Sequence, residues 1–211
     1  MNSSEHIERY LQSCRTEFWQ GIFQFEIEYL LRHLEGFRKV LSVGCGPAII
    51  EIALCDAGFQ VTGLDVSRET LERAPDGIRA VVAHAGDMPF PESSFDAVIY
   101  VASLQFIKDY REALENTARV LRPAGKLIVM LLNPESVFFK EKFRDPGSYV
   151  SRIRHTDLGT IENVIAGKFK VRTEYFLGVK GNAVFESHKP AESVLYNIVG
   201  ERKLVQKDPT A

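Results

Sequence analysis

The most informative segment of the chain reads Val40-Leu41-Ser42-Val43-Gly44-Cys45-Gly46-Pro47-Ala48-Ile49. An apolar run, a glycine pair and a helical pattern in this order predict a strand, a tight turn and a helix. Pro47 suits the start of that helix, where its missing N–H costs nothing. Glycine lets the backbone approach a ligand closely, and a helix N-terminus offers free N–H groups to an anion. Taken alone, the glycine pair fits a ligand-binding loop and a plain turn equally well.

Strands and helices alternate outward from this segment. Residues 110–121 have the clearest helical stripe, Ser67 is a predicted N-cap, and residues 7–36 also have a helical period. The alternating run at 169–177, followed by Gly181-Asn182 and 183–186, predicts an antiparallel hairpin. Five short aliphatic runs, typical of strands covered on both faces, lie at 39–43, 61–65, 80–83, 97–101 and 127–132.

This order predicts an α/β fold, because parallel neighbouring strands need a crossover element between them. We expect a doubly wound, mainly parallel, seven-stranded Rossmann-like sheet. A C-terminal antiparallel hairpin and an N-terminal helical cap complete the predicted architecture. Residues 133–155, which contain two prolines and scattered aromatic residues, have no firm assignment, and a helix is expected at 157–166.

The composition narrows the class of protein. With 26 Lys and Arg against 28 Asp and Glu, the formal net charge is −2, so no whole-molecule field draws the chain to nucleic acid or an anionic membrane. Three cysteines cannot all pair within the chain, which favours a reducing, cytoplasmic compartment. No apolar run reaches the ~18 residues of a membrane span, and the five histidines lack ligand spacing. We therefore expect no nucleic acid, no membrane span and no metal; the oligomeric state stays open.

Asp65 makes the glycine turn a predicted nucleoside site. It follows Gly44 by 21 residues, at the end of the second strand, where a carboxylate can accept both hydroxyls of an adenosine ribose. NAD and S-adenosylmethionine share this geometry. The dinucleotide fingerprint has a third glycine where this chain has Ile49, which weakens the NAD interpretation.

At this point the sequence resembles the class I S-adenosylmethionine-dependent methyltransferases, especially the small-molecule, ubiquinone/menaquinone-biosynthesis-like group of type 11. The resemblance covers roughly residues 40–132. It is carried by Val40–Ile49, by Gly63-Leu64-Asp65-Val66-Ser67, by Gly86-Asp87-Met88-Pro89-Phe90-Pro91 with Ser94-Phe95-Asp96, and by Arg119-Val120-Leu121-Arg122-Pro123-Ala124-Gly125-Lys126-Leu127.

The resemblance implies S-adenosyl-L-methionine as cofactor, S-adenosyl-L-homocysteine as product and a set of cofactor-binding residues. Asp65 would hold the ribose and Asp87 the adenine amino group, since a carboxylate only accepts hydrogen bonds. Two departures stand out: Ser42 occupies the place of a usual acid, and Ala48 that of a glycine. The implied set also contains Gly44, Cys45 and Gly46 along the methionine moiety, Val66, Gly86 and Met88 around the adenine, and Val101 and Ala102 at the methyl-donor site.

The expected activity is methyl transfer to a small, partly apolar acceptor. No motif identifies a catalytic base, so the catalytic residues and the acceptor atom stay open; the acceptor-site candidates are Trp19, Gln105, Tyr149 and His155. The alternatives are a non-catalytic S-adenosylmethionine-binding protein and, more weakly, an NAD-dependent oxidoreductase. We expect one domain over residues 1–211. Its parts would be a helical cap (1–38), a cofactor-binding core (39–132), a lid with a helix (133–168), a closing hairpin (169–188) and a loose tail (203–211).

Overall fold

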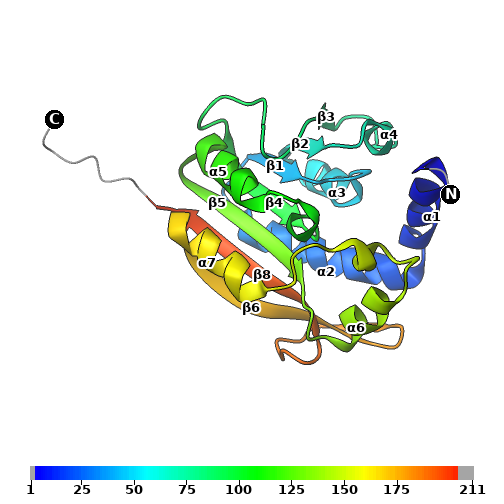
Figure 1. Cartoon of the computed structure of the whole chain (residues 1–211). Coiled ribbons are helices and arrows are strands. Elements are labelled where there is room, and N and C mark those ends of the chain that lie inside the picture. Colours follow the sequence, from blue (N-terminus) through cyan, green and yellow to red (C-terminus); the bar gives the residue numbers. More distant parts are fainter. Residues whose placement is uncertain (1–2, 204–211) are drawn as a thin grey trace, which may run out of the picture.

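The structure is a computed structural model that describes the backbone of residues 3–203 and the side chains from residue 7 onward. Its strands form one sheet in the order β3-β2-β1-β4-β5-β8-β6-β7 (Figure 1). The strands are β1 (Lys39–Val43), β2 (Gln60–Asp65), β3 (Arg79–Val82), β4 (Phe95–Val101), β5 (Leu121–Leu132), β6 (Phe169–Lys180), β7 (Ala183–Phe185) and β8 (Ser193–Arg202).

The first five strands are parallel, with Val40 opposite both Val61 and Ala97. The last three are antiparallel to their neighbours. The predicted α/β fold class is therefore confirmed. The helices that connect the strands are α1 (Ser3–Cys14), α2 (Glu17–His33), α3 (Ile49–Asp56), α4 (Arg68–Leu71), α5 (Tyr110–Val120), α6 (Val137–Arg144) and α7 (Leu158–Lys168), with 3-10 turns η1 (Leu104–Phe106) and η2 (Tyr149–Arg152).

Helices cover both faces of the sheet (Figure 1). The helices α2, α3 and α6 pack on one face, against Val40 of β1 and Ile128 of β5. The helices α5 and α7 pack on the other, against Leu41 and Val129. Side chains alternate between the faces of a strand, so a continuous apolar run such as 127–132 fills both cores.

The sheet has eight strands among the described residues, not the predicted seven. The hairpin of β6 and β7 exists, but the described chain does not close on it, because β8 follows and lies between β5 and β6. The strand β8 is almost wholly buried and shows no period-2 alternation, so the alternation test could not detect it. Of the expected loose tail, residues 204–211 lie outside the described residues.

Two local predictions are also corrected. The predicted helical stretch at 7–36 is divided into α1 and α2 near Thr16. Helix α3 begins at Ile49 behind Ala48, so Pro47 lies before the helix rather than at its first position. Ala48 has φ +60°, the left-handed conformation for which glycine is better suited. The methyl group at this position therefore sits on a strained backbone.

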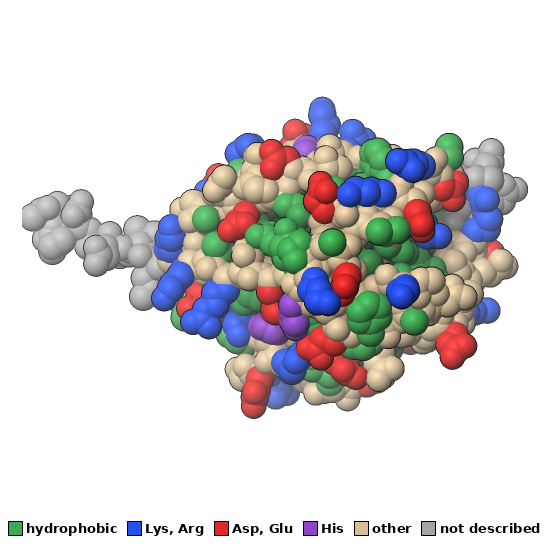
Figure 2. Space-filling model, turned by 90° about the horizontal axis from the view of Figure 1, so that it is seen from below, with side chains coloured by type: hydrophobic (Ala, Val, Ile, Leu, Met, Phe, Trp, Pro, Cys, Tyr) green, Lys and Arg blue, Asp and Glu red, His purple; other side chains and the backbone are tan. Residues whose placement is uncertain are grey.

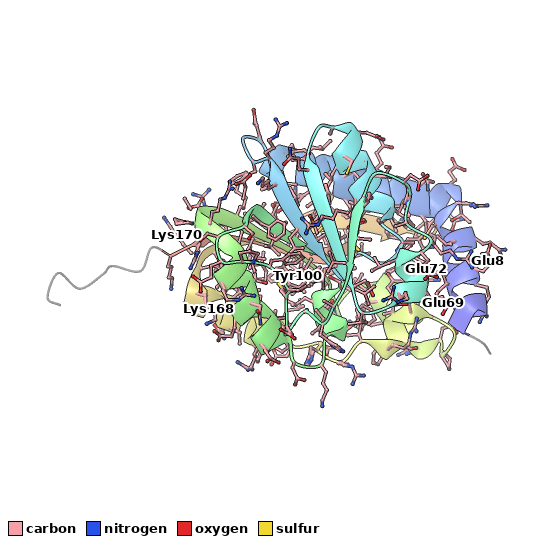
Figure 3. The ribbon with its side chains drawn as sticks, turned by 90° about the horizontal axis from the view of Figure 1, so that it is seen from above. Glu8, Glu69, Glu72, Tyr100, Lys168 and Lys170 are labelled. Carbon is pink, nitrogen blue, oxygen red and sulfur yellow. The ribbon has the colours of Figure 1, made fainter. Side chains whose placement is uncertain are left out.

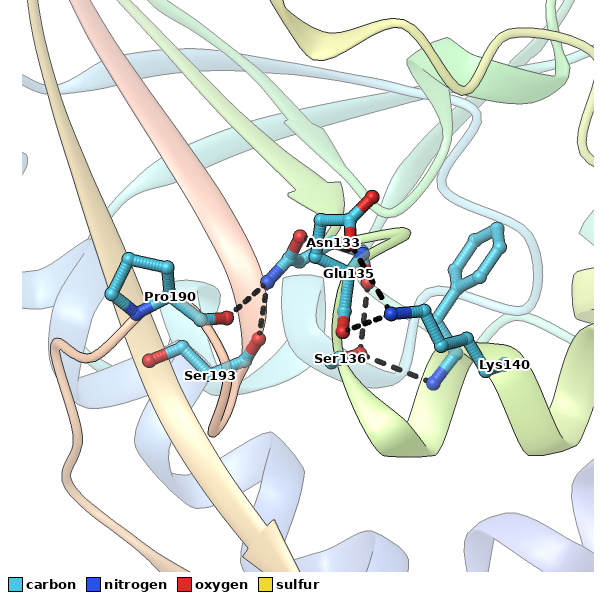
Figure 4. Close-up of polar contacts among 7 residues, drawn as sticks. Asn133, Glu135, Ser136, Lys140, Pro190 and Ser193 are labelled. Atoms are coloured by element: carbon cyan, nitrogen blue, oxygen red, sulfur yellow. Dashed lines mark hydrogen bonds and ion pairs between the residues drawn. The ribbon is translucent and has the colours of Figure 1, made fainter.

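Asn133 connects the end of β5 to the start of α6 (Figure 4). Its buried amide donates to the carbonyl groups of Pro190 and Ser193, each at 2.8 Å. Ser136 then caps α6 by accepting from Phe139 N–H at 3.1 Å. These bonds fix α6 against the loop that enters β8, and with it the segment predicted to be a lid.

The surface mixes charges of both signs. Acidic and basic side chains are interspersed with apolar patches on the face seen from below in Figure 2. None of the described helices combines the length and the apolar character that a membrane crossing requires.

Candidate functional site

The glycine turn lies at the carboxyl end of β1, between β2 and β4. Gly44 has φ +71° and donates its N–H to Leu64 O at 2.7 Å. A Cβ at Gly44 would lie 2.7 Å from Cβ of Ser103, which follows β4. Both the backbone conformation and the space therefore require glycine here. Because Gly44 lies this close to Ser103, backbone atoms of the turn, not side chains, line this part of the sheet edge.

Asp65 lies at the end of β2 and faces that turn. Its Oδ2 accepts from Gly46 N–H at 3.0 Å and its Oδ1 accepts from Ser67 N–H at 2.9 Å. A carboxylate has about four lone-pair sites, so about half of its capacity stays free. Ser67 caps α4 by accepting from Thr70 N–H at 3.2 Å, as predicted. Asp65 is thus held in place without serving as the helix cap.

The loop after β3 carries Gly86, Asp87 and Met88, and α5 fixes it. Asn116 donates to Gly86 O at 2.6 Å. Arg119 donates to Met88 O at 2.8 Å and to Phe90 O at 2.6 Å. Asp87 is exposed between these anchored residues, whereas Met88 is buried. Neither Asn116 nor Arg119 is among the predicted site residues, although Arg119 lies in one of the segments that carry the family resemblance.

Apolar surface borders the two carboxylates. Val66, directly after Asp65, is 57% exposed, which is unusual for a large aliphatic side chain. Val101 ends β4 half-buried. Ala102 follows it at φ +46°, a conformation that non-glycine residues adopt mainly at constrained sites. The residues of the expected cofactor set thus lie along one edge of the sheet.

Ser42, which stands where an acid was expected, is paired with an acid from another element. Its buried Oγ donates to Oε1 of Glu51 at 2.5 Å. Burial, partly offset by this hydrogen bond, raises the pKa of Glu51 to about 7. Glu51 was missed from the sequence, although one charged residue inside the apolar run Ile49-Ile50-Glu51-Ile52-Ala53-Leu54 is a detectable signal.

Cys45 packs inward from the turn. A Cβ at Gly63 would lie 2.7 Å from its Sγ, so the thiol fills the space above β2. Burial, and then the charges of Glu51 and Asp65, raise the pKa of this thiol. A protonated, half-buried thiol is a poor nucleophile, and the contacts of Cys45 fit a small packing residue.

Two of the four acceptor-site candidates come together. Trp19 of α2 and Tyr149 of η2 are half-buried, and their ring centroids lie 6.0 Å apart. Tyr149 also stacks on Phe106 of η1 at 6.1 Å. Helix α1 adds Tyr10, whose ring meets Tyr149 edge-on at 6.4 Å.

Gln105 and His155 instead hold backbone segments together. Gln105 is fully buried; its amide donates to Leu132 O at 3.1 Å and accepts from Leu132 N–H at 2.7 Å. The ring of His155 has Nε2 3.0 Å from Ile107 O and meets Tyr110 edge-on. These contacts fix the segment after η2 to β5 and η1. The side chains of Gln105 and His155 are thus engaged with backbone groups.

Helix α1 lies beside α4, across the end of β2. Glu8 of α1 lies close to Glu69 and Glu72 in Figure 3, and its Oε2 is 3.7 Å from Arg73 Nη1. This contact is exposed and contributes less than ~1 kcal/mol. The contact shows that α1, which carries Tyr10, lies next to the end of α4.

A doubly wound sheet whose carboxyl edge holds a glycine turn and an acid at the end of β2 is the arrangement found in nucleoside-binding α/β proteins. Residues 41–129 match the family described as "Methyltransferase domain". The predicted resemblance to methyltransferases is thus confirmed over this part of the chain.

Several curated relatives are also methyltransferases by name. The chain is 35% identical over 127 residues to the O-methyltransferase resE of Aspergillus sclerotiorum, covering 52% of this chain and 48% of the relative. It is 34% identical over 97 residues to a demethylmenaquinone methyltransferase of Tropheryma whipplei, covering 44% and 41%. The matches therefore span about half the length of these relatives or less.

A solved structure resembles nearly the whole chain. A protein of Thermotoga maritima, described as a SAM-dependent methyltransferase and possible histamine N-methyltransferase, has a TM-score of 0.75 at 21% identity, covering 94% of this chain and 99% of that one. At this identity the likeness establishes the fold alone. It includes the antiparallel end of the sheet, which lies outside the matched family segment.

Proposed function

We propose that this protein transfers the methyl group of S-adenosyl-L-methionine to a small, partly apolar acceptor in the cytoplasm. One observation carries the proposal: Gly44, Asp65 and the anchored Asp87 loop lie together at the carboxyl edge of β1, β2 and β3. In doubly wound sheets this edge binds nucleoside ligands. The methyltransferase domain at residues 41–129 supports the choice of cofactor.

The residues at this edge fit the cofactor's chemistry. Asp65 would accept from the ribose hydroxyls with its free lone pairs, and Asp87 would accept from the adenine amino group. The exposed Val66 would cover one face of the base. Glu51, held by Ser42, would receive the ammonium group of the methionine moiety. In this chain the acid expected on β1 would thus come from α3.

When bound, the cofactor supplies an electrophilic methyl group, so the protein has no need of its own nucleophile. The protein's residues would orient the acceptor and exclude water. Helix α1, η2 and α6 supply the apolar side chains for this task, including Tyr149 and Phe138.

Two alternatives remain distinct from this proposal. A non-catalytic S-adenosylmethionine-binding protein would use the same edge, and the lack of a recognised base motivates it. An NAD-dependent oxidoreductase is disfavoured by Ile49 in place of the third glycine.

Incubation with methyl-labelled S-adenosylmethionine and a metabolite extract, followed by mass spectrometry, tests the proposal. A labelled small molecule is expected. Calorimetric binding of the cofactor without transfer to any member of a broad acceptor panel would favour the non-catalytic alternative. Binding of NADH without binding of S-adenosylmethionine would establish the oxidoreductase.

A further inference from the structure

Glu26 of α2 is a largely buried acid with no polar partner among the described residues. It is 4% exposed, and among residues 7–203 no hydrogen bond or ion pair involves its carboxyl group. Buried polar groups are nearly always paired, and each unpaired one costs about 1–3 kcal/mol. Such a group therefore needs an explanation in terms of something it binds.

Glu26 interacts electrostatically with groups on three other elements. Burial, and then the charge of Glu51 on α3, raise the pKa of Glu26 to about 8. Burial, and then the charges of Glu26 and Cys14, raise the pKa of Tyr149 on η2. The same carboxylate is among the smaller causes that raise the pKa of Tyr10 on α1. The charge of Glu51 thus acts on Cys45, whereas the charge of Glu26 acts on the two tyrosines.

Aromatic residues lie along the same face of α2 as Glu26. We define the aromatic wall as Tyr10, Trp19, Phe106 and Tyr149, which come from four elements and meet around the Tyr149 ring. Trp19 and Glu26 are seven residues apart on α2, so they share one face of that helix, two turns apart. Phe23, between them, stacks on Trp19 at 6.1 Å.

We propose that Glu26 and the aromatic wall form an acceptor subsite that takes an organic cation, namely an amine carried on an apolar or aromatic body. Aromatic faces attract ammonium groups, and the attraction strengthens in a desolvated site. The Glu26 carboxyl, whose pKa of about 8 keeps it protonated in the free site at neutral pH, would release its proton to solvent and pair with the ammonium group, because a buried charge is stable only when it is paired. This inference rests on the proposed function, since it names the class of acceptor for the same site.

The cofactor's own ammonium group is the competing occupant. Two features assign it to Glu51 instead. The Glu51 carboxyl is bound by Ser42 of β1, two residues before the glycine turn, and the charges of Glu51 and Asp65 both act on Cys45 within the turn. The groups on which the Glu26 charge acts include Tyr149 and Tyr10, but not the residues of the turn.

Trp19 provides a direct test, because it is the only tryptophan in the chain and belongs to the wall. The folded protein is titrated with phenethylammonium, with benzyltrimethylammonium and with the neutral 2-phenylethanol, while Trp19 fluorescence is followed. Each titration is run without and with saturating S-adenosylhomocysteine. The variants are Glu26→Gln and, as matched control on the same helix, the exposed Glu28→Gln.

The cations are expected to change Trp19 fluorescence and to bind about tenfold more tightly than the neutral probe, as charged hydrogen bonds and cation–π contacts imply. Glu26→Gln should remove this preference, leave 2-phenylethanol binding unchanged and leave S-adenosylhomocysteine affinity within about twofold, and Glu28→Gln should resemble the wild type. Circular dichroism verifies folding of both variants.

Other outcomes overturn the proposal. If Glu26→Gln weakens S-adenosylhomocysteine but not the cations, Glu26 holds the cofactor. Equal binding of the neutral and cationic probes would make the wall a plain apolar surface. If wild-type protein binds the cations but no S-adenosylhomocysteine, the proposed function fails while the cation subsite stands, so the two failures are distinguishable.

Discussion

The two sides of the carboxyl edge hold their proposed ligands with different parts of the chain. On the cofactor side the contacts come from backbone and side chains within one stretch of the chain, from Ser42 to Ala102. On the acceptor side they come from side chains of α1, α2, η1 and η2, which are far apart in the sequence. The cofactor is shared by many methyltransferases, whereas the acceptor differs. The residues proposed to bind the shared cofactor thus lie at the sheet edge, whereas those proposed to bind the variable acceptor lie in the helices and turns around it.

The largest effect should come from the cofactor side. Asp65→Ala removes the proposed ribose acceptor and also the acceptor for Gly46 and Ser67 N–H groups. We expect about a hundredfold loss of S-adenosylmethionine affinity, or about 2.7 kcal/mol, as for lost hydrogen bonds to a charged group. Calorimetry measures it, with the exposed Asp76→Ala as control. Unchanged affinity would contradict the position assigned to the ribose.

The stability of the protein should depend on pH because of the two buried acids Glu26 and Glu51. Folding raises the pKa of Glu26 to about 8 and of Glu51 to about 7, so the folded state holds protons that the unfolded state releases above about pH 4.5. The free energy of unfolding should therefore fall as the pH rises from about 4.5 to about 8. The ionisable groups that interact electrostatically with Glu26 are Glu51, Tyr149 and Tyr10.

Glu26→Gln tests this pH dependence. Near pH 8.5 we expect the variant to be more stable than the wild type by about 2 kcal/mol, which corresponds to about 4–8 °C in Tm. The difference should shrink toward pH 5, where the wild-type carboxyl is protonated. Thermal unfolding followed by circular dichroism provides the measurement. A constant difference at all pH values would mean that Glu26 does not titrate in the folded state.

The contrast also explains what could be predicted from sequence. The turn at Gly44 and the acid at Asp65 are local patterns with a fixed spacing, and the backbone geometry that they require is the same in every sheet of this class. The strand β8 was missed because Ser193–Arg202 is buried along both faces and has Asn197 and Gly200 within it. Neither alternation nor a turn signal distinguishes such a segment.

On the acceptor side, residue type alone does not distinguish a substrate contact from a structural one. Gln105 and His155 have side chains able to bind a substrate, but their partners are backbone groups of residues 27 and 48 positions away. Only the tertiary fold brings those groups together. Glu26 and Glu51 gave a weaker signal, a charge within an apolar helical run, whose meaning depends on the helix face that is buried.

An intermediate effect is expected for the clamp on the Asp87 loop. Arg119→Met removes the donors to Met88 O and Phe90 O while keeping an unbranched side chain. We expect about a tenfold loss of cofactor affinity, since two hydrogen bonds of about 1 kcal/mol each position the loop. The exposed Arg111→Met on the same helix is the control. Equal calorimetric affinities for the two variants would show that α5 does not position Asp87.

The smallest effect should come from Ser42, which acts through Glu51. Ser42→Ala removes the 2.5 Å hydrogen bond that lowers the pKa of Glu51 against its burial. We expect about fivefold weaker cofactor binding at neutral pH, or about 1 kcal/mol. The pH at which affinity rises should also move upward, because Glu51 would ionise later. A merely structural role for Ser42 would lower affinity without moving that pH.

The double variant Ser42→Asp with Glu51→Gln sharpens this test by returning the acid to β1. If the cofactor's ammonium needs one carboxylate at this position, the double variant should bind S-adenosylmethionine within about threefold of the wild type. Ser42→Asp alone should bind less well, because two adjacent buried carboxyl groups disfavour ionisation of each other. Equal affinities for the single and double variants would show that Glu51 does not replace the missing acid, and the ammonium would then have to be held elsewhere along the edge.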